Sequence, residues 1–154
     1  MTKKIIIITF LLALGFVTYG QESNVIIQVN DKLVLDGFAN SFVKVNYDGK
    51  LRSFPVDYTP GKLKLSEKVW NIISQDSTGK FNLHFDFYTF KKQKSKIANF
   101  KAELTLGLLK SDYLIINIYD FRDRKYRKWY GPYTDEKYLV EFRYPNGPIH
   151  VRHE

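Results

Sequence analysis

Hydrophobic and polar residues alternate with a period of two along most of the chain. In the segment 81–88, phenylalanine and leucine alternate with polar residues and tyrosine. Because successive side chains of a β-strand point to opposite faces, this pattern predicts a strand with one apolar and one polar face. The segments 100–106 and 138–144 show the same alternation, whereas nearly all positions of 113–119 are apolar. The last of these segments is therefore predicted to be a central strand that is covered on both faces.

Four shorter apolar segments predict further strands in the first half of the chain, at residues 25–29, 33–35, 41–47 and 51–54. The segment 91–96, Lys-Lys-Gln-Lys-Ser-Lys, is too polar to be buried and is predicted to be the loop of a hairpin. Eight or nine short strands, separated by turns with glycine and proline, predict an all-β fold: an antiparallel β-sandwich of the immunoglobulin type or a related type. A closed barrel is the alternative, because periodicity does not determine strand order.

The dipeptide Asp48-Gly49 lies between two of these segments and is a strong signal for a hairpin. A two-residue loop pairs Val45 with Arg52, whereas a three-residue loop pairs Val45 with Leu51. We expect the second register, because it places one apolar side chain opposite another.

The segment 66–74 is the one candidate for a helix. Ser66 is suited to cap a helix at its N-terminus, and the acidic Glu67 is suited to the first turn. Apolar residues fall on one face at helical spacing, at Leu65, Val69, Trp70 and Ile73. A strand is the alternative interpretation of the same residues.

The first 20 residues have the pattern of a secretory signal peptide. Lys3 and Lys4 precede an unbroken apolar run of 13 residues, 5–17, and small residues follow at Thr18 and Gly20. A helix of that length spans only ~20 Å, which is less than the ~30 Å of a hydrocarbon core. We therefore expect cleavage after Gly20, with an uncleaved N-terminal anchor as the alternative.

Cleavage would leave residues 21–154 as a single domain, exported to the periplasm or the extracellular space. The leader holds two of the 24 basic residues and no acidic residue, so this part has 22 basic and 16 acidic residues and a formal charge of +6. It contains no second apolar stretch that approaches the ~20 residues of a transmembrane helix. Because the chain has no cysteine, disulfides, cysteine-based metal sites, a thiol nucleophile and a lipoprotein anchor are excluded.

Catalytic motifs are not apparent in the sequence, which contains no Gly-x-Ser-x-Gly elbow, P-loop, dinucleotide-binding fingerprint or His-Glu-x-x-His motif. His84 and Asp86 lie two residues apart on the polar face of a predicted strand, where such pairs are common. His150 and His153 would face opposite sides of a strand, which argues against a shared metal ion. We therefore expect a protein that is not an enzyme and that needs no metal or cofactor.

The strongest candidate for a binding surface is the segment 122–133, which combines five basic residues with four aromatic residues. We expect it to turn between two strands as a basic-aromatic hairpin. Aromatic faces stack on sugar rings, and guanidinium groups pair with phosphate, sulfate or carboxylate. By strand parity Trp129 points away from Tyr126 and Tyr130. In the alternative interpretation the hairpin is an ordinary one, and these two tyrosines pack inward.

The lysines of the 91–96 loop would extend this surface if the loop lies beside it. The candidate binding residues are therefore Arg122, Arg124, Tyr126, Arg127, Trp129, Tyr130, Tyr133, Lys91, Lys92 and Lys94. We expect a protein-interaction or structural module of the cell envelope, whose partner is an envelope or extracellular protein. The alternative is a module that binds an acidic glycan or an envelope lipid. Export and the lack of a nucleic-acid-binding motif argue against nucleic acid as the partner.

Overall fold

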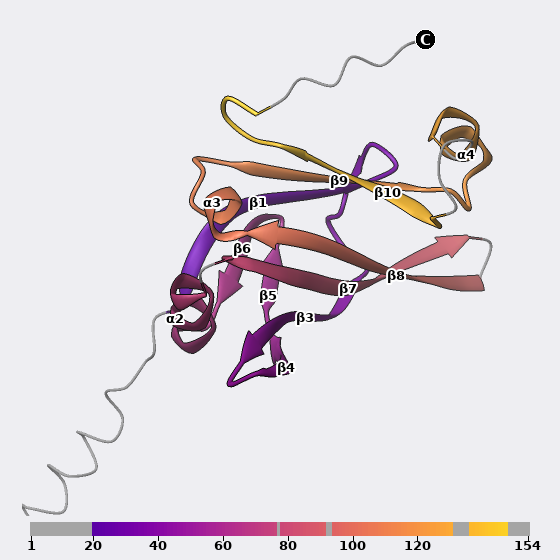
Figure 1. Cartoon of the computed structure of the whole chain (residues 1–154). Helices are drawn as coiled ribbons and strands as arrows, with labels where there is room; N and C mark the ends of the chain where they lie inside the picture. Colours follow the sequence, from indigo (N-terminus) through magenta and orange to yellow (C-terminus); the bar gives the residue numbers. More distant parts are fainter. Residues whose placement is uncertain (1–19, 77, 92–93, 131–135, 148–154) are drawn as a thin grey trace, which may run out of the picture.

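The computed structural model describes residues 20–76, 78–91, 94–130 and 136–147 of the chain. Within these residues, ten strands and three helices form two β-sheets that pack together (Figure 1). This architecture confirms the predicted all-β sandwich. The predicted leader up to residue 19 lies outside the described residues, as do the candidates Lys92, Tyr133, His150 and His153.

The larger sheet has six strands in the order β10-β9-β1-β6-β5, with β2 paired to β1. These strands are β1 (Gln21–Val29), β2 (Lys32–Leu33), β5 (Asp57–Thr59), β6 (Gly61–Leu65), β9 (Leu114–Asp120) and β10 (Tyr138–Arg143). The pairing of β1 with β9 is parallel, and the others are antiparallel. β9 lies between β1 and β10 and is buried except at Ile115, as predicted for a central strand. The sequence did not predict β5 and β6, which together with the eight predicted strands make the ten strands of the described residues.

The smaller sheet has four antiparallel strands in the order β4-β3-β7-β8. They are β3 (Phe38–Tyr47), β4 (Lys50–Pro55), β7 (Lys80–Lys91) and β8 (Lys94–Thr105). β7 and β8 form the predicted hairpin, but the loop predicted at 91–96 is wrong, because pairing continues to Lys91 opposite Lys94. Polar side chains do not interrupt a hairpin, since the ladder satisfies the backbone groups whatever the side chains are.

The inner faces of the two sheets form the main apolar core. Leu83 of β7, Ala102 of β8 and Ile27 of β1 are fully buried. Phe85 packs against Phe100 of the neighbouring strand, with ring centroids 5.6 Å apart. Burying a large apolar side chain contributes roughly 1.5–3 kcal/mol, so this core is the main source of stability in a chain without cysteine.

The turn between β3 and β4 has two residues, so the expected three-residue loop is wrong. Val45 pairs with Arg52 rather than with Leu51. Asp48 and Gly49 both have positive φ angles, 52° and 68°, as a two-residue type I′ turn requires. Because β4 is an edge strand, Arg52 stays exposed although Val45 opposite it is buried. Turn geometry therefore decides the register here, not the matching of apolar side chains.

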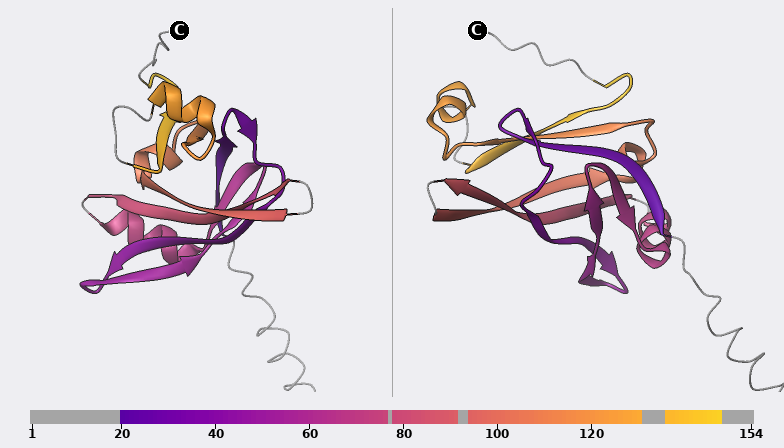
Figure 2. Two further views of the ribbon diagram at one scale, coloured as in Figure 1. Left: turned by 90° about the vertical axis from the view of Figure 1, so that its right-hand side faces the viewer. Right: turned by 180° about the vertical axis from the view of Figure 1, so that it is seen from behind.

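The helices are α2 (Glu67–Gln75), α3 (Leu106–Leu109) and α4 (Arg124–Tyr130). α2 confirms the helix predicted at 66–74: Ser66 Oγ accepts a hydrogen bond from the Val69 N–H at 3.4 Å, and Val69 and Ile73 are buried. The sequence pattern did not predict α3 or α4. Figures 1 and 2 show α2 and α4 at opposite ends of the sandwich.

Candidate functional site

The segment that we expected to form a basic-aromatic hairpin contains a helix instead, α4. Asp123 caps it, because its carboxylate accepts a hydrogen bond from the Lys125 N–H at 2.9 Å. Residues 124–130 include no glycine, proline or β-branched residue, and Gly131-Pro132 follows them in the sequence. These are ordinary signals for the start, middle and end of a helix. The prediction failed because it weighed the charge and aromatic content of the segment and not these signals.

Two tyrosines four residues apart anchor α4 to the six-stranded sheet. The rings of Tyr126 and Tyr130 stack on Tyr119 of β9, with centroid distances of 5.7 Å and 4.6 Å. Tyr119 is fully buried, and Tyr126 is 4 % exposed. The Tyr126 hydroxyl also lies 2.8 Å from the carbonyl oxygen of Asn30 and 2.9 Å from the carboxylate of Asp31. Both tyrosines thus pack inward, and Tyr126 is too buried to contact a partner molecule.

Trp129 belongs to the same helix, so the predicted strand parity does not apply to it. Its ring meets that of Tyr126 edge-on, with centroids 5.7 Å apart. Trp129 is nevertheless 46 % exposed. Lys125 Nζ lies 4.4 Å from the centroid of the tryptophan ring, which is a cation–π geometry. The expectation that Trp129 points away from the two tyrosines is therefore wrong, and the ring is accessible beside a positive charge.

An open surface pocket of about 540 Å³ lies beside α4, lined by Phe121, Arg122, Arg124, Arg127 and Lys128. Helical spacing brings Arg124, Arg127 and Lys128 to one side of α4, three and four residues apart. All three are exposed, and none forms an ion pair within the part of the chain that the structure describes. Arg124 and Arg127 were predicted as binding residues. Lys128 was not among the predicted binding residues, because its spacing from Arg124 is meaningful only in a helix, and Phe121 lies just before the segment that was predicted to bind.

Arg122 also borders the pocket, but its guanidinium group is bound to the fold. Its Nε donates to Asp120 Oδ2 at 2.8 Å, and its Nη1 donates to the carbonyl oxygen of Ile97 in β8 at 2.9 Å. The Asp120 side chain is only 12 % exposed, so this ion pair is partly buried. Arg122 therefore joins the end of β9 to the edge strand β8 and neutralises the Asp120 carboxylate.

The basic end of the β7–β8 hairpin lies at the same end of the molecule as α4 in Figures 1 and 2. The backbone pairs Lys91 with Lys94 there. The contact of Arg122 with Ile97, three residues from Lys94, ties this hairpin to the residues that precede α4. The two basic segments thus share one end of the sandwich, and a joint binding surface stays a prediction.

The predicted pair His84 and Asp86 is engaged by other residues. The imidazole stacks on the ring of Phe42, with centroids 4.9 Å apart and planes inclined by 7°. The Asp86 carboxylate accepts hydrogen bonds from the side-chain amides of Asn40, at 2.7 Å, and Asn99. The two side chains therefore have separate partners, and Asp86 does not orient the imidazole.

Burial lowers the pKa of His84 below its ordinary value, and the positive charges of Lys44 and Lys101 lower it further. Because Asp86 has other partners, it does not supply His84 with the orienting carboxylate that a catalytic histidine often has. In the described residues, no group of three or more histidine, aspartate or glutamate side chains is placed to hold a metal ion.

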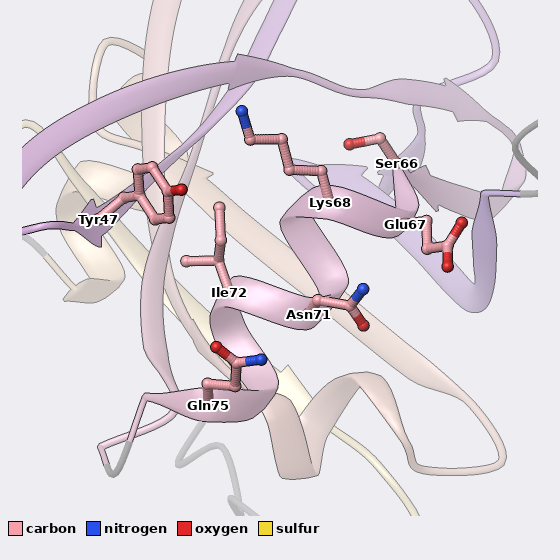
Figure 3. Close-up of a pocket in the computed structure, with 7 residues that line it drawn as sticks. All are labelled: Tyr47, Ser66, Glu67, Lys68, Asn71, Ile72 and Gln75. Carbon is pink, nitrogen blue, oxygen red and sulfur yellow. The ribbon is translucent and has the colours of Figure 1, made fainter.

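A second open pocket, of about 500 Å³, lies between α2 and the end of β3 (Figure 3), and sequence analysis missed it because these elements are distant in the chain. Its lining consists of Tyr47, Ser66, Glu67, Lys68, Asn71, Ile72 and Gln75. Lys68 Nζ lies 5.6 Å from the ring centroids of both Tyr47 and Phe54. Since Lys68 contacts these rings and Glu67 is its neighbour, this pocket does not concentrate charge as the one beside α4 does.

The described residues include no helix with the length and apolar character needed to cross a membrane. Comparison of the chain with protein-family models, with curated proteins and with solved structures finds no match. Function is therefore inferred from the geometry of α4 and its surroundings.

Proposed function

We propose that this protein is an exported, non-catalytic β-sandwich that binds an acidic ligand of the cell envelope, a glycan or a lipid head group. The binding region is the α4 surface, which comprises Arg124, Arg127, Lys128 and Trp129. The observation that carries the proposal is the pocket beside α4, where three exposed cations have no ion-pair partner among the described residues. An acidic group bound there supplies the missing negative charge.

The charge pattern of α4 is unfavourable for the helix on its own. Like charges three or four residues apart, such as Arg124 with Lys128, each cost roughly 0.2–0.5 kcal/mol. Arg124 and Lys125 also lie in the first turn, where positive charge opposes the helix dipole, whereas the Asp123 carboxylate at the N-cap and the positive charges of Arg127 and Lys128 in the last turn favour the helix. The stacking of the two tyrosines on Tyr119 holds the helix in place despite these costs. Locally unfavourable residues of this kind are expected where they serve function.

The accessible groups of α4 favour an acidic ligand over a protein partner. Aromatic side chains supply many of the strongest contacts in protein interfaces. Tyr126 is buried, and Tyr130 is stacked on Tyr119, which leaves Trp129 as the one exposed aromatic ring of the helix. Lys125 lies over its ring, and the helix carries three further cations, Arg124, Arg127 and Lys128. The sequence alone favoured a protein partner, with an acidic glycan or lipid as the alternative. The accessible groups of α4 favour the acidic ligand instead.

Trp129 gives the α4 surface a second kind of contact. An exposed indole ring beside a lysine can stack on a sugar ring or lie at the boundary between lipid head groups and acyl chains. Both partners occur outside the cytoplasm, where the leader in residues 1–20 is expected to deliver the protein.

The test uses the full-length gene product as processed by the expressing cell, and compares it with the triple variant Arg124→Gln, Arg127→Gln and Lys128→Gln. The probes are polygalacturonate and vesicles of phosphatidylcholine that contain phosphatidylglycerol. The proposal expects binding to at least one probe that weakens steeply with added salt, because exposed charges are screened over about 10 Å at 0.1 M salt. It also expects the triple variant to lose that binding.

A control variant with the same change in net charge carries Lys50→Gln, Lys64→Gln and Lys110→Gln. These lysines are exposed and lie on other elements or their ends, away from α4. Binding that is retained in the control and lost in the triple variant supports the α4 surface. Equal losses in both variants would show that net charge alone causes the binding, and the proposal would then be wrong.

A further inference from the structure

We infer that the group bound in the pocket beside α4 is a phosphate monoester. This inference rests on the proposed function and names the chemistry of its ligand. The residues that carry it are Phe121, Arg122, Arg124, Arg127 and Lys128, which line the pocket. A monoester of this kind occurs as a lipid head group or as a soluble phosphorylated molecule, and the experiment below distinguishes the two sources.

The charges around the pocket match a dianion better than a monoanion. Arg124, Arg127 and Lys128 supply three positive charges at the pocket. A carboxylate or a phosphate diester carries a single negative charge, whereas a phosphate monoester carries about −1.5 to −2 at pH 7. Its three terminal oxygens also accept several charge-assisted hydrogen bonds, which suits two guanidinium forks and an ammonium group.

Two acidic residues, Asp120 and Asp123, are adjacent in sequence to residues that line the pocket, and the first of them is neutralised. Asp120 precedes Phe121, and its carboxylate accepts hydrogen bonds from both Nε and Nη2 of Arg122. Arg122 thereby removes a negative charge that would repel a phosphate. Phe121 is 8 % exposed and gives the pocket a rigid apolar wall. Asp123 remains, and its carboxylate caps the N-terminus of α4 through the Lys125 N–H.

A comparison of Lys125 with Arg127 distinguishes binding in the pocket from general attraction to a positive surface. It belongs to the same short helix as Arg127, but it lies against the ring of Trp129 and does not line the pocket. Replacement of either residue by glutamine removes one positive charge from α4. If the ligand responds only to the general field of the helix, the two replacements weaken binding equally. If the phosphate lies in the pocket, Arg127→Gln weakens binding far more.

The experiment measures binding of the full-length gene product, as processed by the expressing cell, to three probes. Two are phosphatidylcholine vesicles with equal surface charge, one containing the monoester phosphatidic acid and the other the diester phosphatidylglycerol. The third is soluble glycerol 3-phosphate. We expect tighter binding to the phosphatidic acid vesicles than to the phosphatidylglycerol vesicles. Arg127→Gln should reduce the first affinity about tenfold or more, as loss of a charged hydrogen bond does, and Lys125→Gln by about threefold or less.

The pH profile tests whether the second negative charge of the phosphate monoester contributes to binding. The second ionisation of a phosphate monoester has a pKa of about 6, so affinity for the monoester should rise between about pH 5 and pH 7. Affinity for the diester should stay flat over the same range. Binding of glycerol 3-phosphate with this profile identifies a soluble phosphate as sufficient, whereas binding confined to the vesicles identifies the lipid as the source.

Failure of the inference and failure of the proposed function give different results. Equal affinity for monoester and diester, or equal effects of Arg127→Gln and Lys125→Gln, would overturn the phosphate site while leaving an acidic ligand on α4. Absence of binding to these three probes, with salt-sensitive binding to polygalacturonate that the triple variant loses, would point to a carboxylate glycan instead. Absence of binding to every acidic probe would overturn both proposals.

Discussion

The hydroxyl group of Tyr138 on β10 binds both backbone groups of Lys101 on β8. It accepts a hydrogen bond from the Lys101 N–H at 2.9 Å and donates one to the Lys101 carbonyl oxygen at 3.3 Å. The Tyr138 ring also meets Phe100 edge-on, with centroids 5.1 Å apart. β8 and β10 are edge strands of different sheets, so one side chain joins the two layers. It also occupies backbone groups that an edge strand would otherwise leave open for pairing with another chain.

We expect Tyr138→Phe to lower the free energy of unfolding by about 1 kcal/mol, because it removes these hydrogen bonds and keeps the ring. Urea denaturation measures the change. Tyr113→Phe is the matched control, since Tyr113 is 46 % exposed, and it should leave the unfolding midpoint unchanged. If Tyr138→Phe is as stable as the unchanged protein, water replaces the hydroxyl at no cost and the contact does not stabilise the sandwich.

Much of this fold can be predicted from local sequence, because alternation and turn residues act over short distances. The segments with the clearest alternation, such as 81–88, all contain strands, and Ser66 correctly marks a helix start. Contacts between distant residues leave no such signal. The parallel pairing of β1 with β9 joins Val25 to Leu114, and neither residue indicates it. At the Asp48-Gly49 turn the local signal was present, but we gave more weight to apolar pairing.

The sequence identified the segment that forms the candidate site, but it did not predict how the side chains of that segment are arranged. Segment 122–133 was identified from its charge, and Arg124 and Arg127 do line a pocket. Which of its aromatic residues are accessible depends on Tyr119, a residue of another element on which Tyr126 and Tyr130 stack. A helix also places residues by a period of 3.6, so the assumption of a strand misplaced Trp129.

Truncation of two aromatic residues of α4 should affect stability to very different extents. Tyr126→Ala removes a buried ring and should lower the free energy of unfolding by about 3 kcal/mol or more. Trp129→Ala removes a half-exposed ring and should change it by less than about 1 kcal/mol. Chemical denaturation of both variants checks this contrast. A large loss from Trp129→Ala would mean that this ring serves the fold, and any binding defect of that variant would then carry no information about the α4 surface.

The ion pair of Asp120 with Arg122 should contribute more to stability than an exposed pair does. Asp120→Asn weakens the attraction to Arg122 in a partly buried setting and should cost about 1–3 kcal/mol. The matched control is Glu103→Gln, which breaks an ion pair with Lys80 whose two side chains are about 60 % exposed. That change should cost about 0–1 kcal/mol. Equal effects, measured by thermal or urea unfolding, would contradict the conclusion that Arg122 stabilises the fold by joining the end of β9 to β8.

The stability of the protein should depend on pH through His84. Because burial and the charges of Lys44 and Lys101 lower its pKa in the folded state, the unfolded chain takes up the proton more readily. The stabilisation from a neutral His84 is therefore complete above the ordinary histidine pKa of about 6.5. It is lost as the pH falls through the lowered pKa of the folded state.

The measurement is urea denaturation of the unchanged protein and of His84→Gln at about pH 7.5 and about pH 5. Glutamine does not titrate, so the variant should lose less stability on acidification than the unchanged protein does. Titration of the imidazole by nuclear magnetic resonance should give a midpoint below the ordinary value, and Lys44→Gln should move that midpoint upward by removing a nearby positive charge. A midpoint at or above the ordinary value would contradict the lowered pKa.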